Sequence, residues 1–305
     1  MVNINDQQDP RIISDGANGA IISWQDSSGT DWDVFAQHLN SSGVATWILN
    51  GVPVCIAATD QVSPRISMDG ASGAFITWQD KRNGVDWDIY AQHLSSGGSA
   101  LWTNNGIGVC TSATTQNSPK IKTDGAGGAY LAWVDKRNGT DDIYAQRLNS
   151  SGASTWTAGG TPVCIATGTQ KDFDIVVNGV DGVVLAWADK RNSMDYDIYA
   201  QRINPSGSPQ WAADGVPVTS AVYDQNNLDM TDDNAGGVII SWVDSSAGNL
   251  DIYTQHVTAA GYGVWGANGQ LIANANDNQT RVKTAGDGIG GVILAFQDKR
   301  TGTFD

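Results

Sequence analysis

Apolar and polar positions alternate along this chain in a pattern that returns at a nearly constant distance. Buried-type aromatic residues that anchor the pattern are 54 or 55 residues apart, at Trp24, Trp78, Trp133, Trp187, Trp242 and Phe296. Each anchor ends an apolar run such as Ala74–Trp78 and is followed by a polar turn, Asp80–Gly84, and by the alternating segment Asp88–Leu94. A fixed period of this size, in units too small to bury their own apolar face, predicts a propeller or a solenoid.

Each repeat predicts four short strands. The first contains a segment such as Pro64–Ile66 and the second is the apolar run, which suits a sheet covered on both faces. The third is the alternating segment, and the fourth resembles Val52–Cys55. Four strands in about 50 residues are typical of a propeller blade. We therefore predict an all-β fold, a six-bladed β-propeller of four-stranded antiparallel blades with an incomplete last blade.

The repeats predict one domain over residues 1–305, without an internal boundary. Its units are expected at about 9–62, 63–117, 118–171, 172–226, 227–278 and 279–305. The last unit stops at Asp305, where the equivalent residues Asp88 and Asp251 only begin the third strand. Its missing strands would leave an open sheet edge, so strand exchange with a partner is expected there.

Composition narrows the class of protein. All 32 acidic residues are Asp, which favours turns over helices, and the formal net charge is −15. Phosphate-rich partners would be repelled, so nucleic acid and anionic membrane surfaces are not expected to bind. Apolar runs are too short for a membrane span, and the first residues do not resemble a signal peptide. The chain is then a mature or excised segment, or it is not exported.

Three cysteines, Cys55, Cys110 and Cys164, occupy the same position in successive repeats. Equivalent positions in neighbouring units rarely approach within the distance that a disulfide needs. Thr219 and Ala273 take this position in later repeats, which fits a packing role. We therefore expect buried free thiols that act as small apolar side chains.

The repeat motifs W-[QVA]-D-K-R-N-G, D-I-Y-A-Q-[HR]-[LI] and N-x-S-G-x-x-x-W resemble the propeller repeats of large secreted or surface-attached proteins of environmental bacteria. This resemblance covers essentially the whole chain and implies a propeller in an extracellular or cell-surface setting. A weaker likeness is to the Asp-box turn of sialidase-type propellers. Gly43 and Trp47 stand one residue further apart than in that turn, so no sialidase role is carried over.

Aspartates recur at matching positions, which argues against a catalytic role for most of them. One series follows the anchor: Asp26, Asp80, Asp135, Asp189, Asp244 and Asp298. A second series precedes the third strand: Asp33, Asp88, Asp142, Asp197, Asp251 and Asp305. A catalytic group is needed once, so recurrence favours bonds to turn amides or pairing with Arg82 and its equivalents. His38, His93 and His256 share a position with Arg147 and Arg202, which predicts a solvated site and not a general base. No catalytic residue is predicted.

Loop residues supply two candidate sites. Trp32, Trp87 and Tyr196 stand where other repeats have Asp141 and Leu250, and such aromatics could stack on sugar rings or on partner side chains, or simply pack over a neighbouring blade. Asp80, Asp86 and Asp88 gather oxygen atoms, as do the Asp31 and Asp195 hairpins, and calcium prefers such ligands. Lys81 and Arg82 could neutralise this charge instead. Apart from calcium, no cofactor is expected.

A third candidate lies on the first strands, where the symmetry of charge is broken. We align Arg11, Arg65, Lys120, Asp174, Asp229 and Arg281 at one position. Asp174 and Asp229 are the two acidic members, and a unique ligand site near the propeller axis would use them. Drift without function is the alternative.

These features favour a non-enzymatic extracellular binding or display module that engages a polysaccharide or a protein surface through loop aromatics. The first alternative is an Asp-dependent polysaccharide-active enzyme. The second is a structural spacer or assembly subunit.

Overall fold

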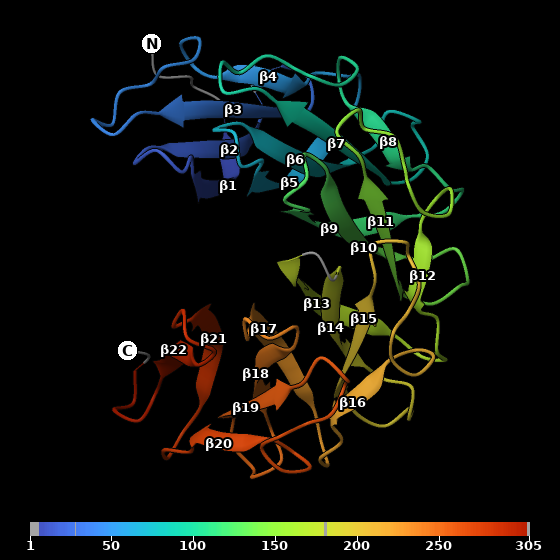
Figure 1. The fold of residues 1–305 in the computed structure, drawn as a ribbon, viewed down its shortest axis with the longest axis vertical. Helices are drawn as coiled ribbons and strands as arrows, with labels where there is room; N and C mark the ends of the chain where they lie inside the picture. The colour runs from blue at the N-terminus through green and yellow to red at the C-terminus, as the bar shows by residue number, and fades with distance from the viewer. Residues whose placement is uncertain (1–5, 28, 180–181, 304–305) are drawn as a thin grey trace. The chain divides into compact units, whose positions relative to one another are not determined.

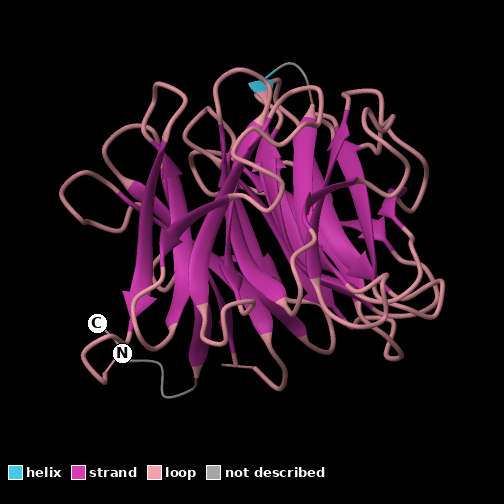
Figure 2. Ribbon diagram, turned by 90° about the horizontal axis from the view of Figure 1, so that it is seen from below, coloured by secondary structure: helices cyan, strands magenta, loops and turns pink. Residues whose placement is uncertain are grey.

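The computed structural model describes residues 6–27, 29–179 and 182–303, and every element named below is a β-strand (Figures 1 and 2). Asp305, expected to begin a third strand, lies outside the described residues. The strands form five four-stranded sheets and one two-stranded sheet in chain order. The prediction of an all-β, six-bladed propeller with an incomplete last blade is confirmed.

The first three blades contain these strands: β1 (Gln7–Ser14), β2 (Ala20–Asp26), β3 (Asp33–Leu39), β4 (Val52–Cys55); β5 (Gln61–Met68), β6 (Ala74–Asp80), β7 (Asp88–Leu94), β8 (Ile107–Cys110); β9 (Gln116–Thr123), β10 (Ala129–Asp135), β11 (Asp142–Leu148), β12 (Thr161–Cys164). The last three contain these: β13 (Gln170–Val177), β14 (Val183–Asp189), β15 (Asp197–Ile203), β16 (Val216–Thr219); β17 (Gln225–Asp232), β18 (Val238–Asp244), β19 (Asp251–Val257), β20 (Gln270–Ala273); β21 (Gln279–Gly286), β22 (Val292–Asp298).

The chain divides into two compact units. The first comprises residues 1–139 and 144–161, and the second comprises residues 140–143 and 162–305. Each unit has its own core of buried apolar side chains. The predicted single domain over residues 1–305 stays a prediction.

Each complete blade is an antiparallel meander whose second strand is its most buried. All seven residues of β10, β14 and β18 are buried, which confirms the apolar run as a strand covered on both faces. In β22 the same run is half-exposed, with Ile293 63% exposed. The predicted strand exchange at this edge stays a prediction.

The first strand of every blade contains a β-bulge. Register with the second strand shifts between Val62 and Arg65 in β5 and at the equivalent place in the other blades. The bulge residue Ser63 has φ 56°, and its counterparts are also non-glycine residues with positive φ. A bulge changes which side chain faces a given neighbour, so it alters the alignment of the residues that follow.

A tryptophan joint links neighbouring blades within each unit. Trp47 Nε1 donates a hydrogen bond to the carbonyl oxygen of Ser96, 2.9 Å away in the next blade. Its ring lies against Gly98, where a Cβ atom would be only 2.8 Å from Trp47 Cδ2. Trp102 and Trp211 make the same bond to Ser150 and Ala259. The N-x-S-G-x-x-x-W motif therefore has two parts. Its turn contacts the tryptophan of the preceding blade, and its own tryptophan contacts the turn of the next blade.

The W-x-D-x-R signature forms a buried network. Asp80 accepts hydrogen bonds from Trp78 Nε1 at 2.8 Å and from both Nε and Nη2 of Arg82 at 2.8 and 2.6 Å. The Arg82 guanidinium lies 3.8 Å from the Tyr90 ring centre and contacts the thiol of Cys55 at 3.1 Å. Equivalent contacts join Cys110 to Arg137 and Cys164 to Arg191. The recurring aspartates after the anchor are thus structural in these blades.

The cysteines are buried and free, as predicted. Burial raises the pKa of Cys55 to about 12 and also raises that of Cys110. These thiols therefore stay protonated near neutral pH and act as packing groups.

Candidate functional site

The hairpin between the second and third strands of blade 2 holds the residues predicted to bind calcium. Asp86 and Asp88 share one amide donor, Asn83 Nδ2, at 2.5 and 3.0 Å. Asp86 also accepts from the backbone N–H of Thr114, in the connection between β8 and β9, at 2.7 Å. Asp80 is held by Trp78 and Arg82, as described above. Among the described residues, no three His, Cys, Asp or Glu side chains gather in a way that could hold a metal ion. Calcium at this hairpin stays a prediction.

Burial makes Asp88 a weaker acid than an ordinary aspartic acid. Asp88 is only 2% exposed. Desolvation, followed by the charges of Asp86 and Asp80, raises the pKa of its carboxyl group to about 6. Asp197 has the same environment in blade 4 and also a pKa of about 6. Because both residues are buried, their carboxyl groups serve the hairpin and are not open to a large substrate.

The blade 1 hairpin differs from the others in charge. Position 28 is Ser28 in the sequence, where Arg82, Arg137, Arg191 and Arg300 stand in four other blades. Blade 5 also has a serine, Ser246, but lacks the D-W-D segment that Asp31, Trp32 and Asp33 form. Blade 1 is therefore the one repeat whose sequence combines that acidic segment with loss of the arginine.

Two carboxylates of this hairpin converge near Gly29. Asp33 Oδ2 and Asp31 Oδ1 lie 3.5 and 3.9 Å from the point where a side chain at Gly29 would begin. Asp33 is partly exposed, in contrast to its buried counterpart Asp88. Desolvation, followed by the charges of Asp31 and Asp26, raises the pKa of Asp33 to about 6. Asp31 accepts a hydrogen bond from the Thr30 hydroxyl at 2.8 Å. This arrangement places a carboxyl group with a raised pKa, Asp33, beside a second carboxyl group, Asp31.

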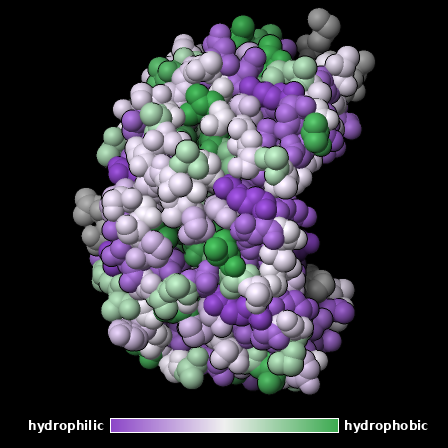
Figure 3. Space-filling model, turned by 90° about the vertical axis from the view of Figure 1, so that its right-hand side faces the viewer, coloured by the Kyte–Doolittle hydropathy of each residue, from purple (hydrophilic) through white to green (hydrophobic). Residues whose placement is uncertain are grey.

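The three predicted loop aromatics are partly exposed, but two of them are covered by lysines. Lys81 Nζ lies 5.6 Å from the centre of the Trp87 ring, and Lys171 Nζ lies 4.0 Å from that of Tyr196. The Trp32 backbone N–H donates to Asp60 Oδ1 at 3.1 Å, which fixes the position of its hairpin against blade 2. On the face shown in Figure 3, apolar side chains form small separate patches among polar ones. Trp32 stands between Asp31 and Asp33 in the sequence, the two residues whose carboxylates converge near Gly29.

The first-strand series requires a correction. Arg11, Arg65, Lys120, Asp174 and Asp229 do share one register position, opposite Ser23, Thr77, Ala132, Ala186 and Ser241. The sixth member is Lys283, which pairs with Ala295, and not Arg281. Arg281 is the bulge residue, with φ 53°, so the alignment was wrong by two residues.

Asp229 and Asp174 have different partners. Asp229 Oδ1 is 3.1 Å from Lys283 Nζ, and Oδ2 accepts from the Thr284 N–H at 2.6 Å. Asp174 accepts from the N–H of Ile175 at 2.9 Å. A ligand role for this pair stays a prediction.

The histidine position is not solvated, contrary to our expectation. His93 Nε2 lies 2.9 Å from Asp69 Oδ2, and the two side chains are 11% and 6% exposed. His38 and His256 form the same pair with Asp15 and Asp233, and Arg147 replaces the histidine beside Asp124. An arginine is tolerated because the partner is an anion, which is why its presence did not indicate exposure.

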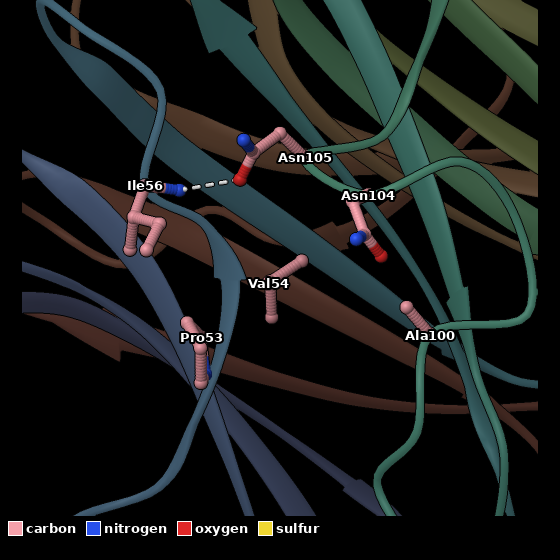
Figure 4. A pocket seen from close by; sticks show the side chains of 6 residues that line it. All are labelled: Pro53, Val54, Ile56, Ala100, Asn104 and Asn105. Carbon is pink, nitrogen blue, oxygen red and sulfur yellow. Dashed lines mark hydrogen bonds between the residues drawn. The ribbon is translucent and has the colours of Figure 1, made fainter.

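A pocket of about 310 Å³ lies in the first unit between blades 1 and 2 (Figure 4). Pro53, Val54, Ile56 and Ala100 line it together with two asparagines. Asn105 Oδ1 accepts a hydrogen bond from the Ile56 N–H at 3.1 Å. The lining has no titratable side chain, so this pocket can hold a ligand but offers no acid–base chemistry.

No family model and no curated protein matches this chain. A protein of unknown function from Dyadobacter fermentans is a similar solved structure, with 8% identity, coverage of 97% of this chain and 91% of that chain, and a TM-score of 0.52. An acylaminoacyl peptidase from Pyrococcus horikoshii has 12% identity over 96% of this chain and 43% of that chain, with a TM-score of 0.51. An α-L-arabinanase from Penicillium chrysogenum has 13% identity over 78% of this chain and 77% of that chain, with a TM-score of 0.48.

These comparisons correct our leading functional reading. An endo-arabinase, an α-L-arabinanase and a putative glycosidase are among the similar structures, and the non-enzymatic binding or display module was the wrong first choice. Its alternative, a polysaccharide-active enzyme, agrees better with them. In the described part of the chain, no helix has the length and apolar character needed to span a bilayer. At this level of identity the similarity shows the fold alone, and the chain is a β-propeller.

Proposed function

We propose that this protein is an Asp-dependent polysaccharide-active enzyme and that the blade 1 hairpin carries its reaction. The observation that supports this proposal is the convergence of two carboxyl groups beside Gly29, Asp31 and Asp33, of which Asp33 has a raised pKa. Glycoside hydrolysis commonly uses such a pair, one carboxylic acid to protonate the leaving oxygen and one carboxylate as base or nucleophile.

The roles follow from the environments. Asp33, whose pKa is about 6, would donate the proton to the glycosidic oxygen, because it keeps its proton to a higher pH than an ordinary aspartic acid. Asp31 would act as base or nucleophile. The ring of Trp32, between them in sequence, would stack on a sugar ring. At position 28 the sequence has a serine where blade 2 has Arg82, whose charge counts among the causes that lower the pKa of Asp88.

The setting proposed for this reaction is extracellular or at the cell surface. The resemblance of the repeat motifs to those of secreted bacterial propellers supports it, and the absence of disulfides does not oppose it because the thiols are buried.

The experiment compares two chemically identical substitutions. Release of reducing ends from arabinan and xylan is measured for the wild type, Asp33→Asn and Asp88→Asn. Removal of a general acid typically lowers the rate about 10²–10⁴-fold, so Asp33→Asn should lose activity on that scale while Asp88→Asn keeps it. The wild-type rate should fall as pH rises above about 6, where Asp33 loses its proton. Equal activity of the two variants would exclude the proposed site.

A further inference from the structure

Arg11 and Arg65 bring two positive charges together in the first unit. They occupy the same register position on β1 and β5, the first strands of neighbouring blades, where they pair with Ser23 and Thr77. These two strands contact each other. The bulges at Asp9 and Ser63, two residues before each arginine, set this alignment in both strands.

Arg65 lacks the acidic partner that other arginines have. Its Nη1 donates to the carbonyl oxygen of Pro64 at 2.8 Å, and no carboxylate among the described residues bonds to it. Arg82, Arg137 and Arg191, in contrast, each bond to an aspartate at 2.5–2.6 Å. A guanidinium has five N–H donors, so most of those on Arg65 are unused within the protein. None of them is a buried atom without a partner, so they are open to the surface.

The positive charges of Arg11 and Arg65 repel each other. Burial, followed by the positive charge of Arg11, lowers the pKa of Arg65, and Asp9 opposes this effect. Asp9 is 3.3 Å from Arg11 Nη2, with both side chains about 40% exposed, so it neutralises Arg11 only in part. A half-buried cation beside a second cation is stabilised when an anion binds to both.

We infer that Arg65 and Arg11 bind an anionic group, the carboxylate of a uronic acid residue in an acidic polysaccharide. The polysaccharide part of this inference rests on the proposed function. Planar guanidinium groups bind carboxylates through two parallel hydrogen bonds, which favours a carboxylate over a neutral sugar hydroxyl. The net charge of −15 opposes an anion at long range, but distant charges are screened beyond about 8 Å at physiological ionic strength.

Position along the strands is compatible with one extended ligand. Arg11 pairs with Ser23, which precedes Asp26 by three residues in β2. At about 3.3 Å per residue, these positions are about 10 Å apart along the strand. An oligosaccharide can span this distance, so an anionic sugar held by Arg65 would bring a neighbouring residue of the same chain toward the blade 1 hairpin.

The test measures binding of trigalacturonate, arabinotriose and inorganic sulfate by isothermal titration calorimetry. Trigalacturonate should bind, and Arg65→Gln should weaken this binding at least about tenfold, because the substitution removes a charge-assisted hydrogen-bond donor. Arg65→Lys should retain part of the affinity and show that the position tolerates change. Lys136→Gln removes an exposed positive charge from the same unit and should have no effect, whereas Asp9→Asn should tighten binding.

Several results would overturn the inference. These are trigalacturonate binding that is unchanged in Arg65→Gln, equal binding of arabinotriose, and binding of sulfate alone. Asp33→Asn separates the two proposals, because it should bind trigalacturonate normally without turnover. Arabinan or xylan turnover without trigalacturonate binding rejects only the anion site, and Arg65-dependent binding without turnover of any polysaccharide rejects only the enzyme.

Discussion

Replacement of Asp88 by Asn should stabilise the protein, and the gain should depend on pH. Asp88 is 2% exposed, and its pKa is raised to about 6 because burial and the charges of Asp86 and Asp80 disfavour its ionised form. Asparagine has nearly the same shape and no charge. Its side-chain oxygen can still accept the bond that Asn83 Nδ2 donates to Asp88 at 3.0 Å.

The sign follows from the two pKa values of this carboxyl group. An unfolded aspartic acid has a pKa of about 3.9, so above that value the unfolded state ionises more readily than the folded state. Stability is therefore lost as pH rises from about 4 to about 6 and stays low above it. A difference from 3.9 to about 6 corresponds to at most about 3 kcal/mol. We expect Asp88→Asn to gain about 1–2 kcal/mol at pH 8 and nothing at pH 4.

Urea unfolding at pH 4, 6 and 8, followed by tryptophan fluorescence, measures this difference. Asp197→Asn serves as an independent repeat, because that carboxyl also has a pKa of about 6 in blade 4. Destabilisation of Asp88→Asn by the same amount at all three pH values would refute the reasoning. Such a result would mean that the negative charge contributes to the hairpin and does not oppose its folding.

Three further predictions concern packing, charge and the sheet edge. Gly98→Ala should lower the free energy of unfolding by about 2–4 kcal/mol, because φ is positive there and the new methyl group would meet the Trp47 ring. Gly43→Ala, at the equivalent turn with open space around it, should lower it by about 1–2 kcal/mol, and thermal unfolding measures both changes. Asp69→Asn should destabilise more at pH 7 than at pH 3. Burial opposes ionisation of Asp69, but hydrogen bonds from His93 and two backbone N–H groups keep its pKa low, and urea midpoints at the two pH values test this sign. A peptide with the sequence of residues 87–111 should bind β22 and protect the amides of residues 292–298 from hydrogen exchange, whereas a scrambled peptide should not.

Much of the fold could be predicted because the six repeats can be compared with one another. Six copies separate positions that always hold an apolar residue from those that vary, and this contrast indicated the strands and the structural role of Asp80 and its equivalents. The same comparison predicted that the three cysteines are free and buried. Periodicity thus predicted whatever depends on contacts that every blade makes.

Features that depend on exact register could not be predicted. A bulge inserts one residue without leaving a motif, so Arg281 was aligned where Lys283 stands. Exposure of the histidine position was misjudged because its partner, Asp69, lies 24 residues away in the chain. The sequence does show that Ser28 replaces an arginine, but the convergence of Asp31 and Asp33 near Gly29 required coordinates.

The tryptophan joint has a consequence for how the gene can change. The bonds of Trp47, Trp102 and Trp211 connect residues 48 or 49 positions apart, so within a unit each of them ties a blade to its immediate successor. Deletion or duplication of one whole repeat within a unit would restore each bond with a new neighbour. Recombination in steps of about 54 codons should therefore yield folded products, whereas cuts of other lengths should not.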